Sequence, residues 1–384
     1  RASAAHVGEL GDADVLAARL ARSRGDTSEE RTMLERAVER LGRAGDRTRS
    51  GIACERLAEL DLVTGTLETA RRHATAAVQR LRGPDEHRAQ VLLATVQSTQ
   101  GDLRAAEATL HHVFASGDTD ELTAWRAASA FADVCRLQGR FSEARSRLAG
   151  LLPSARIQAP AAVFAGMCLA AAQLDIDLYR VGQARERIAQ AADAAKGSLT
   201  PTVDAMVALL GARLAVLAGD SQGAVRILEP AVDRAQGRQL TLYAARLQAA
   251  RGIAWMRVGR VAAGEQELTA ATNLLRSAGA LPALAEVAIA RAELADGRED
   301  PAILFADVAS WMEMQPARVV RLEYLLAALR WAESDDRGRE SRRERAAALR
   351  GQAETLFGQI RAMLSPEEET SLGVHPWRQI LRWG

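Results

Sequence analysis

The chain has 384 residues, of which 48% are hydrophobic and 26% are charged, and its 50 lysines and arginines nearly balance its 49 acidic residues. The resulting net charge of +1 argues against a dedicated nucleic-acid-binding protein, because binding to a phosphate backbone needs a surplus of positive charge. The longest apolar run, residues 161–172, is too short to cross a membrane. The three cysteines show no paired spacing, so we expect no disulfide framework and a reducing, cytoplasmic location.

The chain begins with Arg1 rather than with methionine, and no signal-peptide pattern follows. We therefore expect a piece of a longer protein or a processed chain. Stretches rich in alanine, leucine and arginine then fill the sequence with helical periodicity, interrupted by a glycine every 15 to 20 residues. Prolines are few and strand patterns are missing, so we expect an all-α protein.

A pattern of small and apolar residues recurs through these stretches at intervals of 36 to 40 residues. The first column of the pattern holds the small residues Ala58, Ala94, Ala132, Ala172, Ala212, Gly252 and Ala290. The second column, always twelve residues later, holds Ala70, Ala106, Ala144, Ala184, Ala224, Gly264 and Ala302. Apolar residues follow four and seven positions after the second column, and in the last copy these are Ala306 and Ala309. Between the two columns stand Gly65, Gly101, Gly139, Gly219, Gly259 and Gly297, with Tyr179 once in place of glycine.

Each copy of this pattern is expected to be a hairpin of two antiparallel helices. The first helix ends near the glycine, which readily adopts the left-handed conformation that terminates a helix. Small residues in the two columns allow the helices to approach to about 8–10 Å. One hairpin cannot bury both of its faces, so the hairpins must stack into a solenoid with a continuous core.

The order of small residue, glycine, apolar turn residue and alanine resembles the tetratricopeptide repeat (TPR) family, as in Ala132…Gly139-Arg140-Phe141-Ser142-Glu143-Ala144. The resemblance covers about residues 45–315, with degenerate copies at both ends. At the start the frame is kept by Ala18, Gly25, Leu34 and Ala37, although Glu30 replaces the small residue, and near the end it is kept by Ala328 and Trp331. The resemblance implies a right-handed superhelical solenoid of about eight hairpins over residues 1–364. A tail, residues 365–384, then caps the last hairpin or docks elsewhere.

The repeat period of 38–40 residues is longer than the 34 that is usual in the family. In this respect the chain is similar to the long-repeat arms of bacterial signal-transduction ATPases and of maltose-activator-type transcription regulators. That similarity implies a non-catalytic interaction scaffold or a regulatory arm of a larger bacterial signalling protein, with a protein, a peptide or a neighbouring domain as its partner. The alternative is a solenoid that senses a small inducer molecule, and small groove-side residues such as Gly166 and Ala249 favour it.

Catalytic and cofactor motifs are missing from the sequence. Lys196 is the only lysine and lacks the glycine-rich turn of a phosphate-binding loop, and the motifs of a protein kinase are absent. None of the six histidines forms a metal-binding pair, and Asp175 and Asp177 diverge on a helix. We therefore expect no enzyme activity, no cofactor and no metal in this segment.

In the TPR family the first helix of each hairpin lines a concave groove. One face of these expected helices carries a mostly polar series, which is acidic in the early copies and rich in arginine in the late ones. The candidate partner-binding residues are Glu59, Arg126, Asp133, Gln173, Asp177, Arg213, Arg246, Arg257 and Arg291. Either this stripe is merely solvated, or it is a site in which Arg213, Arg257 and Arg291 contact an acidic partner segment.

Two further features lie near the C-terminal end. Residues 337–350 are rich in arginine but interleaved with Glu340 and Glu344, which is typical of a solvated helix face; the alternative is a patch for nucleic acid or an acidic partner. The last segment, from His375 to Trp383, contains two tryptophans and two aliphatic residues. We expect it to cover the last hairpin, with docking to another domain as the alternative.

Overall fold

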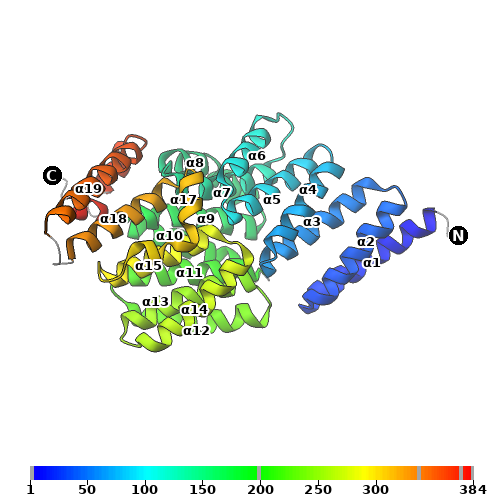
Figure 1. Cartoon of the computed structure of the whole chain (residues 1–384). Helices are drawn as coiled ribbons and strands as arrows, with labels where there is room; N and C mark the ends of the chain where they lie inside the picture. The colour runs from blue at the N-terminus through cyan, green and yellow to red at the C-terminus, as the bar shows by residue number, and fades with distance from the viewer. Residues whose placement is uncertain (1–3, 197–199, 335–338, 372–374, 382–384) are drawn as a thin grey trace.

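The computed structural model describes residues 4–196, 200–334, 339–371 and 375–381, and every regular element in these ranges is a helix (Figure 1). The first five antiparallel pairs are α1 (Ala4–Arg24) with α2 (Thr27–Arg43), α3 (Arg47–Thr64) with α4 (Leu67–Arg80), α5 (Pro84–Gln100) with α6 (Leu103–Ala115), α7 (Glu121–Gln138) with α8 (Phe141–Gln158), and α9 (Ala161–Asp177) with α10 (Val181–Ala195). The all-α solenoid of helix pairs expected from the repeat is confirmed.

Four more pairs and a short tail complete the described chain. The pairs are α11 (Pro201–Leu217) with α12 (Ser221–Gly237), α13 (Thr241–Arg257) with α14 (Val261–Ala278), α15 (Leu281–Ala295) with a broken second helix, and α18 (Arg318–Ser334) with α19 (Arg339–Arg361). The tail contains α20 (Pro366–Ser371) and α21 (Pro376–Leu381). The described residues thus form nine pairs, and both degenerate ends of the repeat fold as hairpins.

The glycines between paired helices have the left-handed backbone that the pattern required, with φ between 79° and 93° at the six glycine positions. Tyr179 adopts φ 56° at the seventh. Several second helices then begin behind an aspartate whose carboxylate accepts a hydrogen bond from a free backbone N–H, as Asp102 does from Ala105 and Asp220 from Gly223. Local sequence therefore sets both the end of one helix and the start of the next.

The two small-residue columns pack against each other inside the hairpins. From the first copy to the sixth, every residue of both columns is buried. Between α13 and α14 both columns hold glycine, and the two backbones are in close contact there. A Cβ added to Gly252 would lie 2.8 Å from the carbonyl oxygen of Gly264, so neither residue has room for a side chain.

The seventh copy departs from the expected pattern. Instead of one second helix, the chain forms α16 (Pro301–Leu304), the 3-10 helix η1 (Ala306–Val308) and α17 (Ala309–Met314). The expected core residues Ala302, Ala306 and Ala309 are exposed in it. The core is filled instead by larger side chains, which are Phe305, Val308, Trp311 and Met312. The alanine column was therefore wrong here, because burying these aromatic and aliphatic side chains removes more apolar surface from water.

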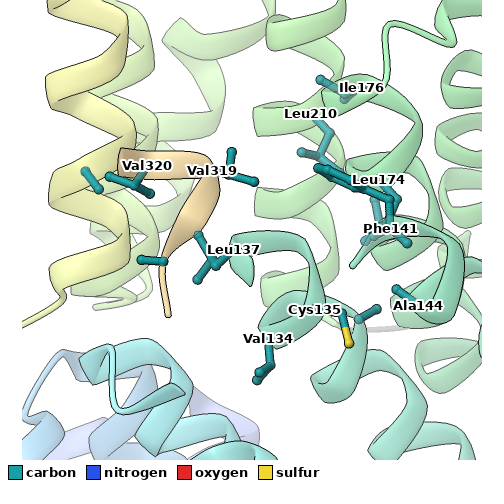
Figure 2. Packing of buried hydrophobic residues seen from close by; sticks show 14 of the residues in the cluster. Val134, Cys135, Leu137, Phe141, Ala144, Leu174, Ile176, Leu210, Val319 and Val320 are labelled. Carbon is teal, nitrogen blue, oxygen red and sulfur yellow. The ribbon is translucent and has the colours of Figure 1, made fainter. Parts of the chain in front are cut away.

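Successive turns of the superhelix touch. Consecutive first helices contact one another from α3 to α18, and α3, α5 and α7 also contact α13, α15 and α18, which lie five pairs further along. The indole Nε1 of Trp311 donates a hydrogen bond of 2.7 Å to the carbonyl oxygen of Gly101. Figure 2 shows Leu137 at the end of α7 beside Val319 and Val320 at the start of α18. The solenoid thus closes around its axis instead of remaining an open arc.

The tail folds back across these turns. Glu368 of α20 is 1% exposed and accepts hydrogen bonds from Ser142 and, at 2.8 Å, from Nη1 of Arg145. Trp377 of α21 is buried against Phe357 of α19. Residues 337 and 338 of the arginine-rich stretch, and Arg382 and Trp383 of the last segment, lie outside the described residues.

Candidate ligand-binding cavity

A cavity of about 490 Å³ lies on the inner side of the superhelix. First helices from α7 to α18 line it, and α21 lines it from the tail. Its apolar wall includes Ile176, Leu209, Val216, Leu217, Ala249, Ala250, Ile253, Ala283, Val287, Ile289, Ala290 and Val319. Its charged residues are Arg136, Asp177, Arg213, Arg246, Arg257, Glu286, Glu293, Glu323 and Arg330. Aliphatic walls with a few polar groups are typical of ligand pockets.

Five of the charged residues form one continuous chain of ion pairs. Asp177 receives Nη2 of Arg213 at 3.2 Å and Nη1 of Arg136 at 3.1 Å. Nη2 of Arg136 reaches Oε1 of Glu286, and Nη2 of Arg246 reaches Oε2 of the same carboxylate, each at 3.1 Å. The Arg136–Glu286 pair joins residues 150 positions apart and connects α7 to α15 across one superhelical turn.

These ion pairs hold Glu286 in its charged form. Burial tends to raise the pKa of its carboxyl, but the charges of Arg246 and Arg136 outweigh burial and lower the pKa to about 2. Asp133 lies at the edge of the same network. Water reaches its carboxylate, but the inner walls of the superhelix surround it and reduce its solvation. This reduced solvation raises the pKa of Asp133, and it outweighs the charges of Arg136 and Arg246, which lower the pKa.

The other end of the cavity is less well neutralised. Arg257 pairs with Glu293 at 3.3 Å. Water reaches the side chain of Glu293, but the surrounding cavity walls reduce its solvation and raise its pKa despite the nearby arginines. Burial, with the nearby charge of Glu293 as a further cause, raises the pKa of Glu323 to about 7. Among the described residues, no carboxylate lies within ion-pair distance of Arg330, the last arginine of the cavity, and its Nε is buried without a hydrogen-bond partner.

Side chains of the tail and of the Tyr179 turn complete this end. The indole Nε1 of Trp377 donates to Oε1 of Glu323 at 2.5 Å. Nε2 of His375 lies 3.1 Å from the carbonyl oxygen of Asp177. The rings of His375 and Tyr179 pack edge to face, with their centroids 4.5 Å apart. Burial lowers the pKa of His375 to about 4, so its ring is neutral near pH 7. Tyr179 therefore places an aromatic ring in the cavity at the position where other copies have glycine.

The candidate residues from the sequence divide into two groups. Asp177, Arg213, Arg246 and Arg257 line the cavity, Gln173 donates to Asp177 at 3.0 Å, and Asp133 lies at its edge. Glu59, Arg126 and Arg291 do not line it. Glu59 pairs instead with Arg56 of the same helix at 2.6 Å. Glu59 lies on α3, which does not line the cavity, whereas Arg126 and Arg291 lie on the lining helices α7 and α15 but are not among the lining residues.

Sequence reasoning missed most of the carboxylates that neutralise these arginines. Glu286 and Glu293 are seven residues apart and so share one face of α15, and they lie 40 and 36 residues after Arg246 and Arg257. This spacing of about one repeat was a signal that could have identified them. Arg136 and Trp377 gave no such signal, because Arg136 meets Glu286 across a superhelical turn and Trp377 enters the cavity from the tail.

The described part of the chain contains no cluster of three or more histidine, cysteine, aspartate or glutamate side chains arranged to hold a metal ion. None of its helices combines the length and apolar character needed to cross a bilayer. The cysteines Cys54, Cys135 and Cys168 are buried and unpaired, and burial raises the pKa of each thiol.

The sequence matches no protein-family model. It matches no curated protein either. The structure is similar to that of a Rap protein complexed with Competence and Sporulation Factor, with a TM-score of 0.56 and 11% identity over 86% of this chain and 98% of that one. This similarity shows a shared fold, and the TPR-like fold expected from the repeat is confirmed.

Two other solved structures, with lower TM-scores, are described as containing tetratricopeptide repeats. One is a tetratricopeptide repeat protein from Parabacteroides merdae, with a TM-score of 0.39 and 14% identity over 73% of this chain and 99% of that one. The other is a Signal Transduction ATPase with Numerous Domains protein with a tetratricopeptide repeat sensor, from Pyrococcus horikoshii. Its TM-score is 0.46 at 12% identity, over 92% of this chain and 55% of that one.

Proposed function

We propose that the chain is a non-catalytic binding module whose inner cavity receives a short segment of a partner protein. The observation that carries this proposal is the cavity itself, in which an apolar wall surrounds charged groups that are already held in place by ion pairs. A site held in this way needs little rearrangement when a ligand enters, so less binding free energy is lost to ordering. We further propose that the chain serves as a regulatory arm of a larger bacterial signalling protein.

The charge of the cavity favours an acidic group on the partner. Five arginines and four carboxylates line it, and the pKa of about 7 leaves Glu323 partly protonated near neutral pH. Arg213 and Arg257 are already paired with carboxylates, whereas Arg330 has no ion-pair partner among the described residues. We therefore assign Arg330 as the arginine that pairs with a carboxylate of the partner, such as an acidic side chain or a peptide C-terminus.

A displayed random-peptide library, selected on the purified chain, tests this function. Ala250→Phe fills the cavity, and Ala263→Phe on the exposed face of α14 is its matched control. We expect the selected peptides to bind the wild type and Ala263→Phe alike, and to bind Ala250→Phe at least about tenfold more weakly, a loss of about 1.4 kcal/mol. Equal binding to the filled variant would place the partner site elsewhere and overturn the proposal.

The role of Arg330 is tested with the same peptides. Arg330→Gln is expected to weaken binding about tenfold and Arg330→Lys less, because lysine keeps the charge but loses the planar fork. Arg291→Gln, outside the cavity, is the control and is expected to leave the affinity unchanged. If Arg291→Gln weakens binding and Arg330→Gln does not, the peptide binds outside the cavity, near Arg291.

A small-molecule ligand is the second candidate function. The volume of about 490 Å³ falls in the range of about 300–1,000 Å³ that is typical of small-molecule sites. A compound that binds there raises the melting temperature of the wild type, because binding to the folded state alone stabilises it. The same compound must leave the melting temperature of Ala250→Phe unchanged. If such compounds are found and the peptide library yields no binder, the small-molecule function is favoured.

A further inference from the structure

The C-terminal helix α21 already occupies one end of the cavity. His375, Pro376, Trp377 and Ile380 line the cavity from this side, and Trp377 is 3% exposed. The indole of Trp377 lies between the carboxylate of Glu323 on α18 and the ring of Phe357 on α19, whose centroid is 6.1 Å away. This seat combines an apolar wall with one hydrogen-bond acceptor, which suits an amphipathic aromatic ring.

The two halves of the tail are held in different ways. α20 is fixed by charged groups, since Glu368 accepts from Ser142 and Arg145, and Glu367 accepts from Nη2 of Arg180 at 2.5 Å. Hydrogen bonds of His375 and Trp377, and one of 3.2 Å from Arg350 to the carbonyl oxygen of Ile380, connect the described side chains and backbone at α21 to the rest of the chain, and no ion pair is among them.

The six residues of α21 are too few to form a helix that is stable alone. Its order therefore depends on its seat in the cavity. With α21 in place the cavity still measures about 490 Å³, so α21 fills one end and leaves the rest open. A longer segment from a partner can cover the same seat and the open part together, and so bury more apolar surface than α21 does.

We propose that α21 is an internal ligand of the cavity, which the partner segment displaces by placing an aromatic side chain with a ring N–H or hydroxyl donor on Glu323. This inference rests on the proposed function and adds the class of partner residue, a tryptophan or a tyrosine. It also gives the tail a regulatory role. While α21 is seated it lowers the apparent affinity for the partner, and by reciprocity the bound partner releases α21.

Hydrogen exchange of the unmodified full chain, followed by mass spectrometry, is the first test. The probe is a synthetic peptide of residues 375–381, His-Pro-Trp-Arg-Gln-Ile-Leu, added at saturating concentration. We expect the amides of α21 in the chain to exchange at least about tenfold faster with the peptide than without it, while those of α18 do not change. Exchange of α21 that is unaffected by the peptide means that this helix is a fixed part of the fold, and it overturns the inference.

Direct binding of the labelled peptide is the second test. Trp377→Ala removes the indole from its seat, whereas Trp331→Ala removes an indole of α18 that does not line the cavity. We expect the peptide to bind Trp377→Ala at least about tenfold more tightly than the wild type or Trp331→Ala, and a peptide with alanine in place of its tryptophan not to bind. Equal affinities for all three chains overturn the inference. If Trp377→Ala does not fold, the exchange experiment decides alone.

The two proposals fail in different ways. The exchange experiment uses the chain's own segment, so it needs no knowledge of the partner. If α21 is fixed but library peptides still distinguish Ala250→Phe from Ala263→Phe, the proposed function stands and only the internal ligand is wrong. If α21 is displaced by its own peptide and no library peptide binds, the cavity is a seat for the tail alone.

Discussion

At the scale of single residues, the cavity depends on the geometry of the guanidinium group. Arg136 presents two Nη atoms in a fixed fork, and one reaches Asp177 on α9 while the other reaches Glu286 on α15. A lysine carries its charge on one nitrogen and lacks this planar fork. The almost complete use of arginine for cations in this chain, with Lys196 as its one lysine, therefore suits the charged network.

Glu323 makes the stability of the protein depend on pH. Burial above all raises its pKa from 4.5 to about 7, so between these values the folded chain holds a proton that the unfolded chain has lost. The stability that this proton contributes is complete below pH 4.5 and is lost as the pH rises to about 7. Glu323→Gln removes this titration and keeps an oxygen acceptor for the indole of Trp377.

We expect the free energy of unfolding of Glu323→Gln, minus that of the wild type, to rise by about 1–3 kcal/mol between about pH 4.5 and 8. Urea titrations of both chains across this range measure the difference. Taking the difference cancels the other titrating groups, which are the same in both chains. A constant difference contradicts the assigned shift of Glu323.

At the scale of helices, the hairpin is set by the size of the residues between its two helices. Alanine fills both columns in most copies, and between α13 and α14, where both columns hold glycine, the two backbones leave no room for a Cβ. This explains why the spacing of twelve residues between the columns never varies, while the links between hairpins do.

Replacement of Gly252 tests this close approach. The added methyl group of Gly252→Ala would lie 2.8 Å from a backbone carbonyl oxygen, so the two helices must separate. We expect a loss of about 1–3 kcal/mol in the free energy of unfolding, as is usual for overpacked sites. Gly211→Ala on α11, where nothing lies within 4 Å, is the matched control and is expected to gain about 0.5–1 kcal/mol from its higher helix propensity. Equal effects of the two changes would contradict the packing argument.

At the scale of the whole molecule, contacts between superhelical turns decide the shape. In four successive hairpins, the residue at the turn packs against a side chain of the next superhelical turn or of the tail. The neighbouring pairs are Gly65 and Ala278, Gly101 and Trp311, Gly139 and Ile360, and Tyr179 and His375. A repeat protein without such contacts behaves as a one-dimensional stack, in which each repeat touches only its neighbours. Here residues more than 100 positions apart pack together, so the cavity has a defined and closed form.

Trp311 offers a test of this closure. It is 4% exposed, and its indole bonds to the turn at Gly101. Trp311→Ala is expected to cost about 3–5 kcal/mol, as large buried side chains do, and to raise the radius of gyration because the turns separate. Small-angle X-ray scattering measures this change. Trp331→Ala, a residue of the last hairpin, is the control and is expected to leave the radius of gyration unchanged.

The sequence by itself determined the elements and their pairing. Glycines at fixed positions end the first helices and small residues fix the contact inside each hairpin, and both are local effects of backbone sterics and side-chain size. The broken second helix after α15 escaped this reasoning, since Phe305 and Trp311 outweigh the alanines that kept the pattern. Four of the nine candidate residues line the cavity, because helical spacing identifies which residues share the inner face.

Only the tertiary structure decided which of these residues meet. Small rotations between neighbouring hairpins add up along the solenoid, and their sum brings α7 against α15 and α18. No local pattern encodes that sum, so Arg136 and Glu286 could not be paired from the sequence. The seat of α21 is of the same kind, because a six-residue helix takes its position from the surface that it meets.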